Sequence, residues 1–142
     1  KEFTKVYCEK GRLLHKDIKT DDMGSLHFEM QGGLKISHVA SWNRPKAFPT
    51  WGDITIDIVG TKGSLYLDAF SQKVDVYSNK NANAQWKPWG NNADLGLIKD
   101  FLNAVREKRE PTITGYDGLQ TLKLTVAAER SAKQKKMVTV PT

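Results

Sequence analysis

One stretch near the middle of the chain decides the fold: Ile54-Thr-Ile-Asp-Ile-Val-Gly-Thr-Lys-Gly-Ser-Leu-Tyr-Leu-Asp68. Its isoleucines and leucines alternate with other residues, which is the period of a strand with one buried face. Gly60 and Gly63 bracket Thr61-Lys62, and glycine there allows the positive φ that a tight reversal needs. The stretch therefore predicts a β-hairpin with a connection of about two to four residues, around which a sheet is built.

The chain before this hairpin predicts a run of strands. Residues 3–9 carry enough apolar side chains for a first strand, and residues 25–31 alternate cleanly between apolar and polar side chains. Gly32-Gly33 is a strong hairpin signal, and residues 34–42 continue the alternation in a returning strand. A loop over residues 43–53 then leads to the central hairpin.

After the central hairpin the period changes. Residues 74–77 predict one more strand, and residues 78–92 predict a polar loop. Apolar residues then recur at helical spacing from Leu95 to Val105, a second helix starts at Thr114, and residues 138–140 predict a last short strand. This order predicts an α+β fold: a largely antiparallel open β-sheet with helices packed on one face.

Length and composition narrow the classes of protein. The 142 residues suffice for one domain, and 39% hydrophobic and 27% charged residues are ordinary for a globular chain. No apolar run approaches the ~20 residues needed to span a bilayer, so we expect no membrane partner. The net charge of +6 comes from basic residues spread over the chain, apart from a cluster at Lys133–Lys136. This cluster lies at the end of a predicted helix, where cations complement the helix dipole and need no ligand. We therefore expect no nucleic-acid partner.

The residues that could carry chemistry are few. Cys8 is the only cysteine, which excludes an intrachain disulfide and a cysteine-based metal cluster and fits a reducing, cytoplasmic setting. His15, His27 and His38 are not spaced as a metal site, so we expect no metal. Asp21-Asp22 could be a carboxylate pair, but a solvated turn is the plainer interpretation.

The tryptophans leave alternatives open. Trp51 and Trp89 lie in predicted loops, where a large aromatic side chain is either a lid over the core or a stacking surface for a sugar or a base. A free-standing carbohydrate-binding module, with Trp86 as a third stacking residue, is therefore one alternative function. A basic nucleic-acid-binding domain is another.

The motifs resemble one known family when they are taken in order. The hairpin of residues 54–68 resembles one in the C-terminal domain of the glucose–fructose oxidoreductase, inositol dehydrogenase and rhizopine-catabolism (Gfo/Idh/MocA) family. Asp22, Gly33 and Ser41-Trp42 fall where the family pattern wants them upstream. Four downstream segments follow in family order: Lys99-Asp-Phe-Leu-Asn-Ala-Val-Arg106, Glu110-Pro-Thr-Ile-Thr-Gly-Tyr-Asp-Gly118, Ala127-Ala-Glu-Arg-Ser-Ala132 and Val138-Thr-Val140. The resemblance covers the chain from about Lys5 to Val140.

The resemblance implies a two-domain, NAD(P)-dependent oxidoreductase of sugars, polyols or related compounds. Its N-terminal Rossmann domain would supply a Gly-x-Gly-x-x-Gly loop, the lysine of a Glu-Lys-Pro motif and an Asp-x-x-x-His pair, and none of these motifs occurs in the 142 residues. We therefore expect residues 1–142 to be one C-terminal substrate and oligomerisation domain, with the Rossmann domain absent from this chain. NAD or NADP would belong to the full-length parent, and we expect no cofactor and no catalytic residue here.

Two sets of residues follow from the same resemblance. The edge nearest the Rossmann domain would form the wall of the pocket for a sugar or polyol substrate, at Trp42, Arg44, Trp51, Trp89 and Asp94. The open face of the sheet would pair with the same face of another subunit in a homo-oligomer, through Val39, Ser41, Val59 and Tyr66.

Overall fold

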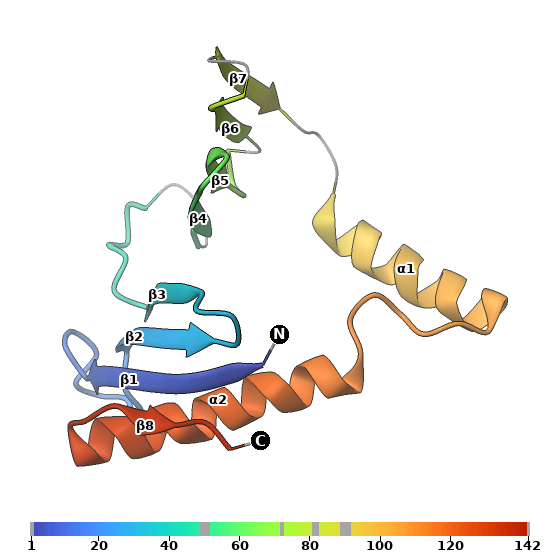
Figure 1. Ribbon diagram of the computed structural model, residues 1–142. Coiled ribbons are helices and arrows are strands. Elements are labelled where there is room, and N and C mark those ends of the chain that lie inside the picture. Colours follow the sequence, from blue (N-terminus) through green and yellow to red (C-terminus); the bar gives the residue numbers. More distant parts are fainter. Residues whose placement is uncertain (1, 49–51, 72, 81–82, 89–91, 142) are drawn as a thin grey trace. The chain divides into compact units, whose positions relative to one another are not determined.

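A computed structural model describes residues 2–48, 52–71, 73–80, 83–88 and 92–141 (Figure 1). Trp51 and Trp89 lie outside the described residues. The chain divides into two compact units, Lys1–Arg44 with Lys108–Thr142, and Pro45–Glu107. Each unit is described by itself below.

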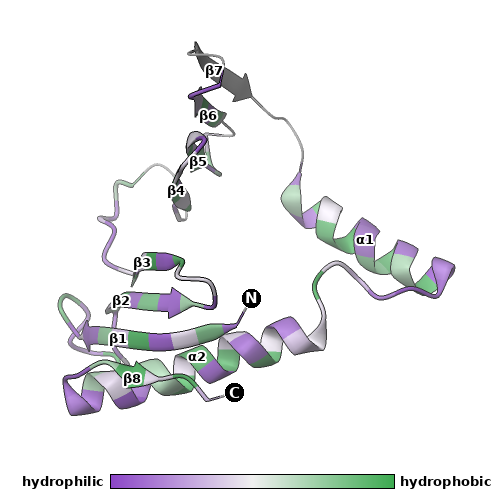
Figure 2. Ribbon diagram, viewed as in Figure 1, coloured by the Kyte–Doolittle hydropathy of each residue, from purple (hydrophilic) through white to green (hydrophobic). Residues whose placement is uncertain are grey.

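The first unit is an antiparallel sheet with one helix on it (Figure 1). The sheet has the order β3-β2-β1-β8, with β1 at Phe3–Gly11, β2 at Met23–Met30, β3 at Lys35–Ser41 and β8 at Val138–Thr139. Hydrophobic and hydrophilic residues alternate along β2, as the sequence predicted (Figure 2). Helix α2, Gly115–Gln134, packs on the face that this alternation makes apolar.

The core of this unit lies between β1 and α2. Val6 is fully buried, and Cys8 is buried one pleat further along the same face of β1. Ala127 and Ala128 meet them from α2, and Val138 and Val140 close the far side. Because alanine is small, the helix lies close to the strand.

Helix α2 begins where the sequence predicted. The Asp117 carboxylate accepts hydrogen bonds from the Thr114 N–H at 2.8 Å and the Thr114 hydroxyl at 2.7 Å. The Thr114 oxygen in turn accepts from the Asp117 N–H at 3.4 Å, which completes a capping box. Chiefly through the Thr114 N–H, these bonds lower the pKa of Asp117. The cap fixes the residue at which α2 begins.

Ser131 is a fully buried hydroxyl at the centre of this packing. Its Oγ accepts a hydrogen bond from the Cys8 N–H at 3.0 Å and donates one to the Lys136 carbonyl at 2.6 Å. Strand β8 pairs with β1 only at Lys5 and Val6. Ser131 therefore takes over as the partner of β1 where β8 no longer reaches.

The second unit holds the central hairpin. Its antiparallel sheet has the order β4-β5-β6-β7, with β4 at Thr55–Gly60, β5 at Gly63–Asp68, β6 at Lys73–Ser78 and β7 at Asn83–Pro88. Gly60 pairs with Gly63 across the turn. Gly63 has φ 148°, and a Cβ there would collide with the Tyr77 carbonyl oxygen, so glycine is required. Gly60 does not have positive φ, so only one of the two predicted glycines serves that purpose.

Helix α1, Ala93–Glu107, also belongs to this unit and matches the predicted first helix. The Asn92 side chain caps it by accepting a hydrogen bond from the Leu95 N–H at 3.0 Å. Among the described residues, neither helix is long and apolar enough to cross a membrane.

The α+β class is confirmed, and the structure corrects three details of the sequence interpretation. The described strands form two four-stranded sheets, where one was expected. The predicted polar loop over residues 78–92 contains β7, which pairs with β6. Its sequence, Asn-Ala-Gln-Trp-Lys-Pro, does alternate, but asparagine, alanine, lysine and proline are depleted in strands, so composition favoured a loop. All residues of β4 are exposed, although alternation predicted a buried face, because among the described elements β4 contacts mainly its sheet neighbour β5 and no helix packs on its apolar face.

Ser131→Ala should lower the free energy of unfolding by about 1–3 kcal/mol, because it leaves the Cys8 N–H and the Lys136 carbonyl without their partner in the core. Urea unfolding at unchanged slope measures this loss. Ser25→Ala on β2 is the matched control and should change the value by less than about 0.5 kcal/mol. Equal losses from both variants would contradict the role given to Ser131.

Candidate functional site

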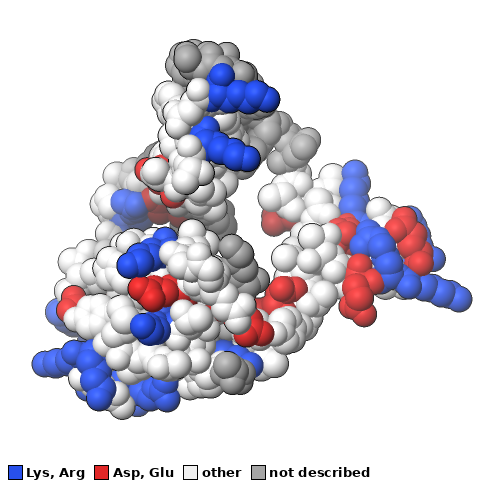
Figure 3. Space-filling model, in the orientation of Figure 1, with Lys and Arg blue, Asp and Glu red and all other residues white. Residues whose placement is uncertain are grey.

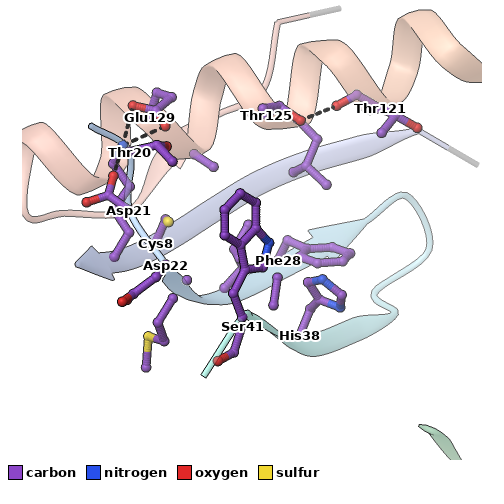
Figure 4. Close-up of a pocket in the computed structure, with 18 residues that line it drawn as sticks. Cys8, Thr20, Asp21, Asp22, Phe28, His38, Ser41, Thr121, Thr125 and Glu129 are labelled. Carbon is purple, nitrogen blue, oxygen red and sulfur yellow. Dashed lines mark hydrogen bonds and ion pairs between the residues drawn. The ribbon is translucent and has the colours of Figure 1, made fainter. Parts of the chain in front are cut away.

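A groove lies on the α2 side of the first sheet (Figure 4). It has a volume of about 520 Å³, and both the sheet and α2 line it. Its apolar lining includes Leu26, Phe28, Ala40, Leu124 and Ala128. The turn Thr20–Asp22 and the end of β3 close one end of it. All of these residues belong to the first unit.

Trp42 lies in the lining of this groove, directly after β3. Its N–H donates a hydrogen bond to the Asp22 carbonyl at 2.9 Å, which continues the pairing of β3 with β2 by one residue. The residue is 66% exposed, so the indole adds little to the core. A large aromatic that is fixed at its backbone and open to solvent suits contact with a ligand.

Asp22 is a buried carboxylate, and the interpretation of Asp21-Asp22 as a solvated turn is wrong for it. Asp22 is only 2% exposed. Its Oδ1 accepts from the Leu13 N–H at 2.7 Å, and its Oδ2 accepts from the Leu14 and His15 N–H groups at 2.9 and 2.8 Å. The loop after β1 is therefore wrapped around this side chain. The only sequence signal was that Asp22 falls at a position of the family pattern.

The environment of Asp22 keeps it ionised. Burial raises the pKa of the Asp22 carboxyl, but hydrogen bonds from the three loop N–H groups and the Asn43 side-chain amide, at 3.4 Å, outweigh burial. Together they hold the pKa well below its usual range. Asp22 is a fixed negative charge in the folded chain at neutral pH.

Asp21 points to a different partner. Lys10 Nζ lies 2.7 Å from Asp21 Oδ2, and 2.7 and 2.8 Å from the two carboxylate oxygens of Glu129 on α2 (Figure 4). Hydrogen bonds to Asp21 and Glu129 raise the pKa of Lys10, so it remains a cation. Burial raises the pKa of the nearby Cys8 thiol, which makes it a poor nucleophile. This end of the groove holds charges in place and offers no activated group.

Two of the three histidines lie on opposite faces of the first sheet, and His15 lies in the loop after β1. His38 lines the groove, and His27 lies on the opposite face, where its Nδ1 is 3.0 Å from the Ser37 hydroxyl oxygen. Within the described ranges, no group of three or more His, Cys, Asp or Glu side chains could hold a metal ion. On the face shown in Figure 3, basic and acidic side chains are interspersed.

The predicted substrate-pocket residues are divided between the two units and the stretches outside the described residues. Trp42 is the one among them that lines the groove. Arg44 ends the first segment of the first unit, and Asp94 lies in the first turn of α1 in the second unit. Trp51 and Trp89 lie outside the described residues.

The predicted interface residues differ in their relation to the groove. His38 and Ala40 line the groove, so Val39 alternates to the opposite face of β3, whereas Ser41, the last residue of β3, is also among the residues that line the groove. In the second sheet, Asp57 pairs with Tyr66, which places Tyr66 on the same face as Val59. Val39 is 65% exposed and Val59 is 83% exposed.

Comparison with known families identifies the class of protein. The model of the "Oxidoreductase family, C-terminal alpha/beta domain" matches residues 18–140. The chain therefore belongs to this oxidoreductase family and represents its C-terminal domain, and the resemblance seen in the sequence is confirmed. No curated protein matches the chain.

Solved structures share the fold at low identity. An oxidoreductase from Thermotoga maritima is 23% identical with a TM-score of 0.84, over 98% of this chain and 41% of that chain. A levoglucosan dehydrogenase in complex with NADH and levoglucosan is 20% identical with a TM-score of 0.81, over 99% and 46%. An oxidoreductase from Agrobacterium radiobacter in complex with NAD+, L-tartaric acid and magnesium is 19% identical with a TM-score of 0.78, over 98% and 44%.

The present chain thus spans less than half the length of each of these proteins. The matches lend no support to a free-standing carbohydrate-binding module, because each is to part of an oxidoreductase.

Asp22 should make stability depend on pH in the acid range. Its folded pKa lies below the unfolded value of about 3.9, so its contribution is complete above that pH and is lost as pH falls toward the folded pKa. Urea unfolding from about pH 6 to about pH 2 should therefore show a steeper loss for the native chain than for Asp22→Asn. Asp17→Asn, an exposed position in the same loop, should behave as the native chain does. Identical pH profiles for the native chain and Asp22→Asn would contradict the assignment.

Proposed function

We propose that this chain is the C-terminal domain of an NAD(P)-dependent oxidoreductase that acts on a sugar, a polyol or a related compound. The family match over residues 18–140 is the observation that carries the proposal. Structural neighbours that bind NADH with levoglucosan, or NAD+ with L-tartaric acid, support the class of cofactor and substrate. In this proposal the domain supplies a wall of the substrate pocket and an oligomer interface, and it is not active alone.

The cofactor would bind to the N-terminal Rossmann domain of the parent. A Rossmann site needs a strand, a glycine-rich turn and a helix, so that backbone N–H groups meet the pyrophosphate. The pairs of adjacent strands that the structure describes are all antiparallel, and β1 leads through a loop to β2 without an intervening helix. The described residues therefore do not fit a nicotinamide cofactor, and the choice between NAD and NADP belongs to the other domain.

The substrate would meet this domain through its aromatic and basic side chains. The exposed indole of Trp42 offers a flat apolar surface on which a sugar ring stacks. Arg44 follows two residues later and would donate hydrogen bonds to a hydroxyl or a carboxylate. Trp51, Trp89 and Asp94 are proposed to complete the wall.

Trp42→Ala in the full-length parent should lower kcat/KM for its sugar or polyol substrate by at least about tenfold, or roughly 1.4 kcal/mol of transition-state binding. The same change should cost the isolated chain little stability, because the indole is mostly exposed. Steady-state kinetics and urea unfolding on one variant measure both quantities. Ile113→Ala, at an equally exposed apolar side chain, is the matched control for both measurements.

A lower stability of Trp42→Ala with unchanged kinetics of the folded enzyme would remove Trp42 from the substrate site.

The assignment of the cofactor to the Rossmann domain is tested by direct binding measurements on this chain. Calorimetry of the isolated chain with NADH and NADPH should give no binding heat, and a dissociation constant in the micromolar range would overturn the assignment of the cofactor to the missing domain.

We also propose that Val39 and Ser41 of the first sheet, and Val59 and Tyr66 of the second, lie in the contact between subunits of a homo-oligomer. Val39 lies on the face of the first sheet away from α2, Ser41 ends the same strand, and Val59 and Tyr66 share a face of the second sheet. Exposed apolar side chains of this kind mark interaction surfaces when they are contiguous, and a small-residue face suits a self-complementary pairing.

Val39→Lys should shift the chain toward monomer, because two-fold pairing would bury like charges against each other. Sedimentation equilibrium over a range of concentrations measures the shift. Ile113→Lys places the same charge at a comparably exposed residue outside the sheets and should leave the association constant unchanged. A native chain that is monomeric at high concentration would refute the interface for this domain.

A further inference from the structure

Three successive backbone N–H groups converge on one carboxylate after β1. The Leu13, Leu14 and His15 N–H groups donate to Asp22 at 2.7, 2.9 and 2.8 Å. Consecutive N–H groups that point into one concavity form a nest, which is an arrangement that binds anions. Here the anion is a side chain of the same chain, and it is 2% exposed.

The same residue is bonded to the end of β3, where Trp42 enters the groove. The Asp22 carbonyl accepts from the Trp42 N–H at 2.9 Å, and the carboxylate accepts from the Asn43 side-chain amide at 3.4 Å. His15 Nε2 lies 3.4 Å from the Trp42 carbonyl oxygen, which adds a contact between the loop and the strand end. Asp22 therefore holds two segments together that are far apart in the sequence.

The chemistry of the contacts requires a carboxylate at this position. Both oxygens are used, Oδ1 by Leu13 and Asn43 and Oδ2 by Leu14 and His15. A carboxamide has one accepting oxygen, and its NH2 group would face two further donors. The neighbouring cation, Lys10, pairs with Asp21 and Glu129 instead, so the donors to Asp22 are amides.

We propose that residues 13–15 are an anion-binding nest occupied by the chain's own Asp22, and that Asp22 is the positioning residue for Trp42 and Asn43 at the groove. Removal of the carboxylate leaves the Trp42 N–H bonded to the backbone carbonyl of residue 22, but it releases the Asn43 amide and the loop whose His15 side chain contacts the Trp42 carbonyl, so the Trp42 side chain is free to move. A small free carboxylate in the nest restores its position. The inference rests on the proposed function in one respect, since Trp42 is assigned there to the substrate wall. Asp22 is 2% exposed, and in this proposal it acts through Trp42.

Asp22→Ala tests the proposal, because it keeps Cβ and removes a group with the shape and charge of formate. NMR of the full chain gives two readouts: amide hydrogen exchange at residues 13–15, and the indole N–H resonance of Trp42, which Trp42→Phe assigns. In Asp22→Ala, protection of the three amides should fall at least about tenfold and the Trp42 resonance should move. Formate should restore both, whereas formamide, its neutral counterpart, and chloride at equal ionic strength should restore neither.

Asp21→Ala is the matched control, because it removes the adjacent carboxylate, which pairs with Lys10 and not with the nest. It should leave the amides of residues 13–15 protected and the Trp42 resonance in place. If Asp22→Ala is unfolded in buffer, the same titrations are read as the folded fraction, which formate must raise and formamide must not.

The proposal is overturned if folded Asp22→Ala keeps the native Trp42 resonance, or if formamide or chloride acts as well as formate. Neither readout uses a sugar or a nicotinamide cofactor. A negative result would therefore count against the positioning role alone, and the substrate class is tested separately by the kinetics of Trp42→Ala.

Discussion

The packing of α2 on β1 is the contact on which the first unit depends. Val6 and Cys8 pack against the alanine side of α2, with Val138 and Val140 in the same cluster, and the strand and helix approach closely because alanine is small. The close approach has a further consequence, because it brings the Ser131 hydroxyl to the Cys8 N–H. A buried polar group in this position must be hydrogen-bonded, so the packing and the hydrogen bond require each other.

The groove follows from the same arrangement. Helix α2 covers β1, while β2 and β3 continue the apolar face beyond the helix, toward Phe28 and Ala40. The groove is closed at one end by Asp22, whose charge is stabilised by backbone donors in place of a cation. Fixed donors cost little reorganisation, so this carboxylate holds the loop and the strand end more rigidly than an exposed ion pair would.

The sequence predicted the local structure best where one short-range rule governs it. The period-2 alternation located β2 and β5, the i, i+3 spacing located α1, and Thr114 with Asp117 located the start of α2. The prediction failed for β7, which alternates as a strand should but consists mostly of residues that are depleted in strands, so that its composition favoured a loop. The prediction of a positive φ at the two hairpin glycines is confirmed for Gly63 and wrong for Gly60.

The sequence by itself thus determined the class of fold and, through motifs in a fixed order, the oxidoreductase family. Only the tertiary structure decided that Asp22 is buried while Asp21 pairs with Lys10, although the two aspartates are adjacent and alike in the sequence. The same is true of Ser131, whose partner at Cys8 is 123 residues away. Periodicity and capping are set by neighbours within one or two turns, whereas the environment of a polar side chain is set by segments that meet only when the chain has folded.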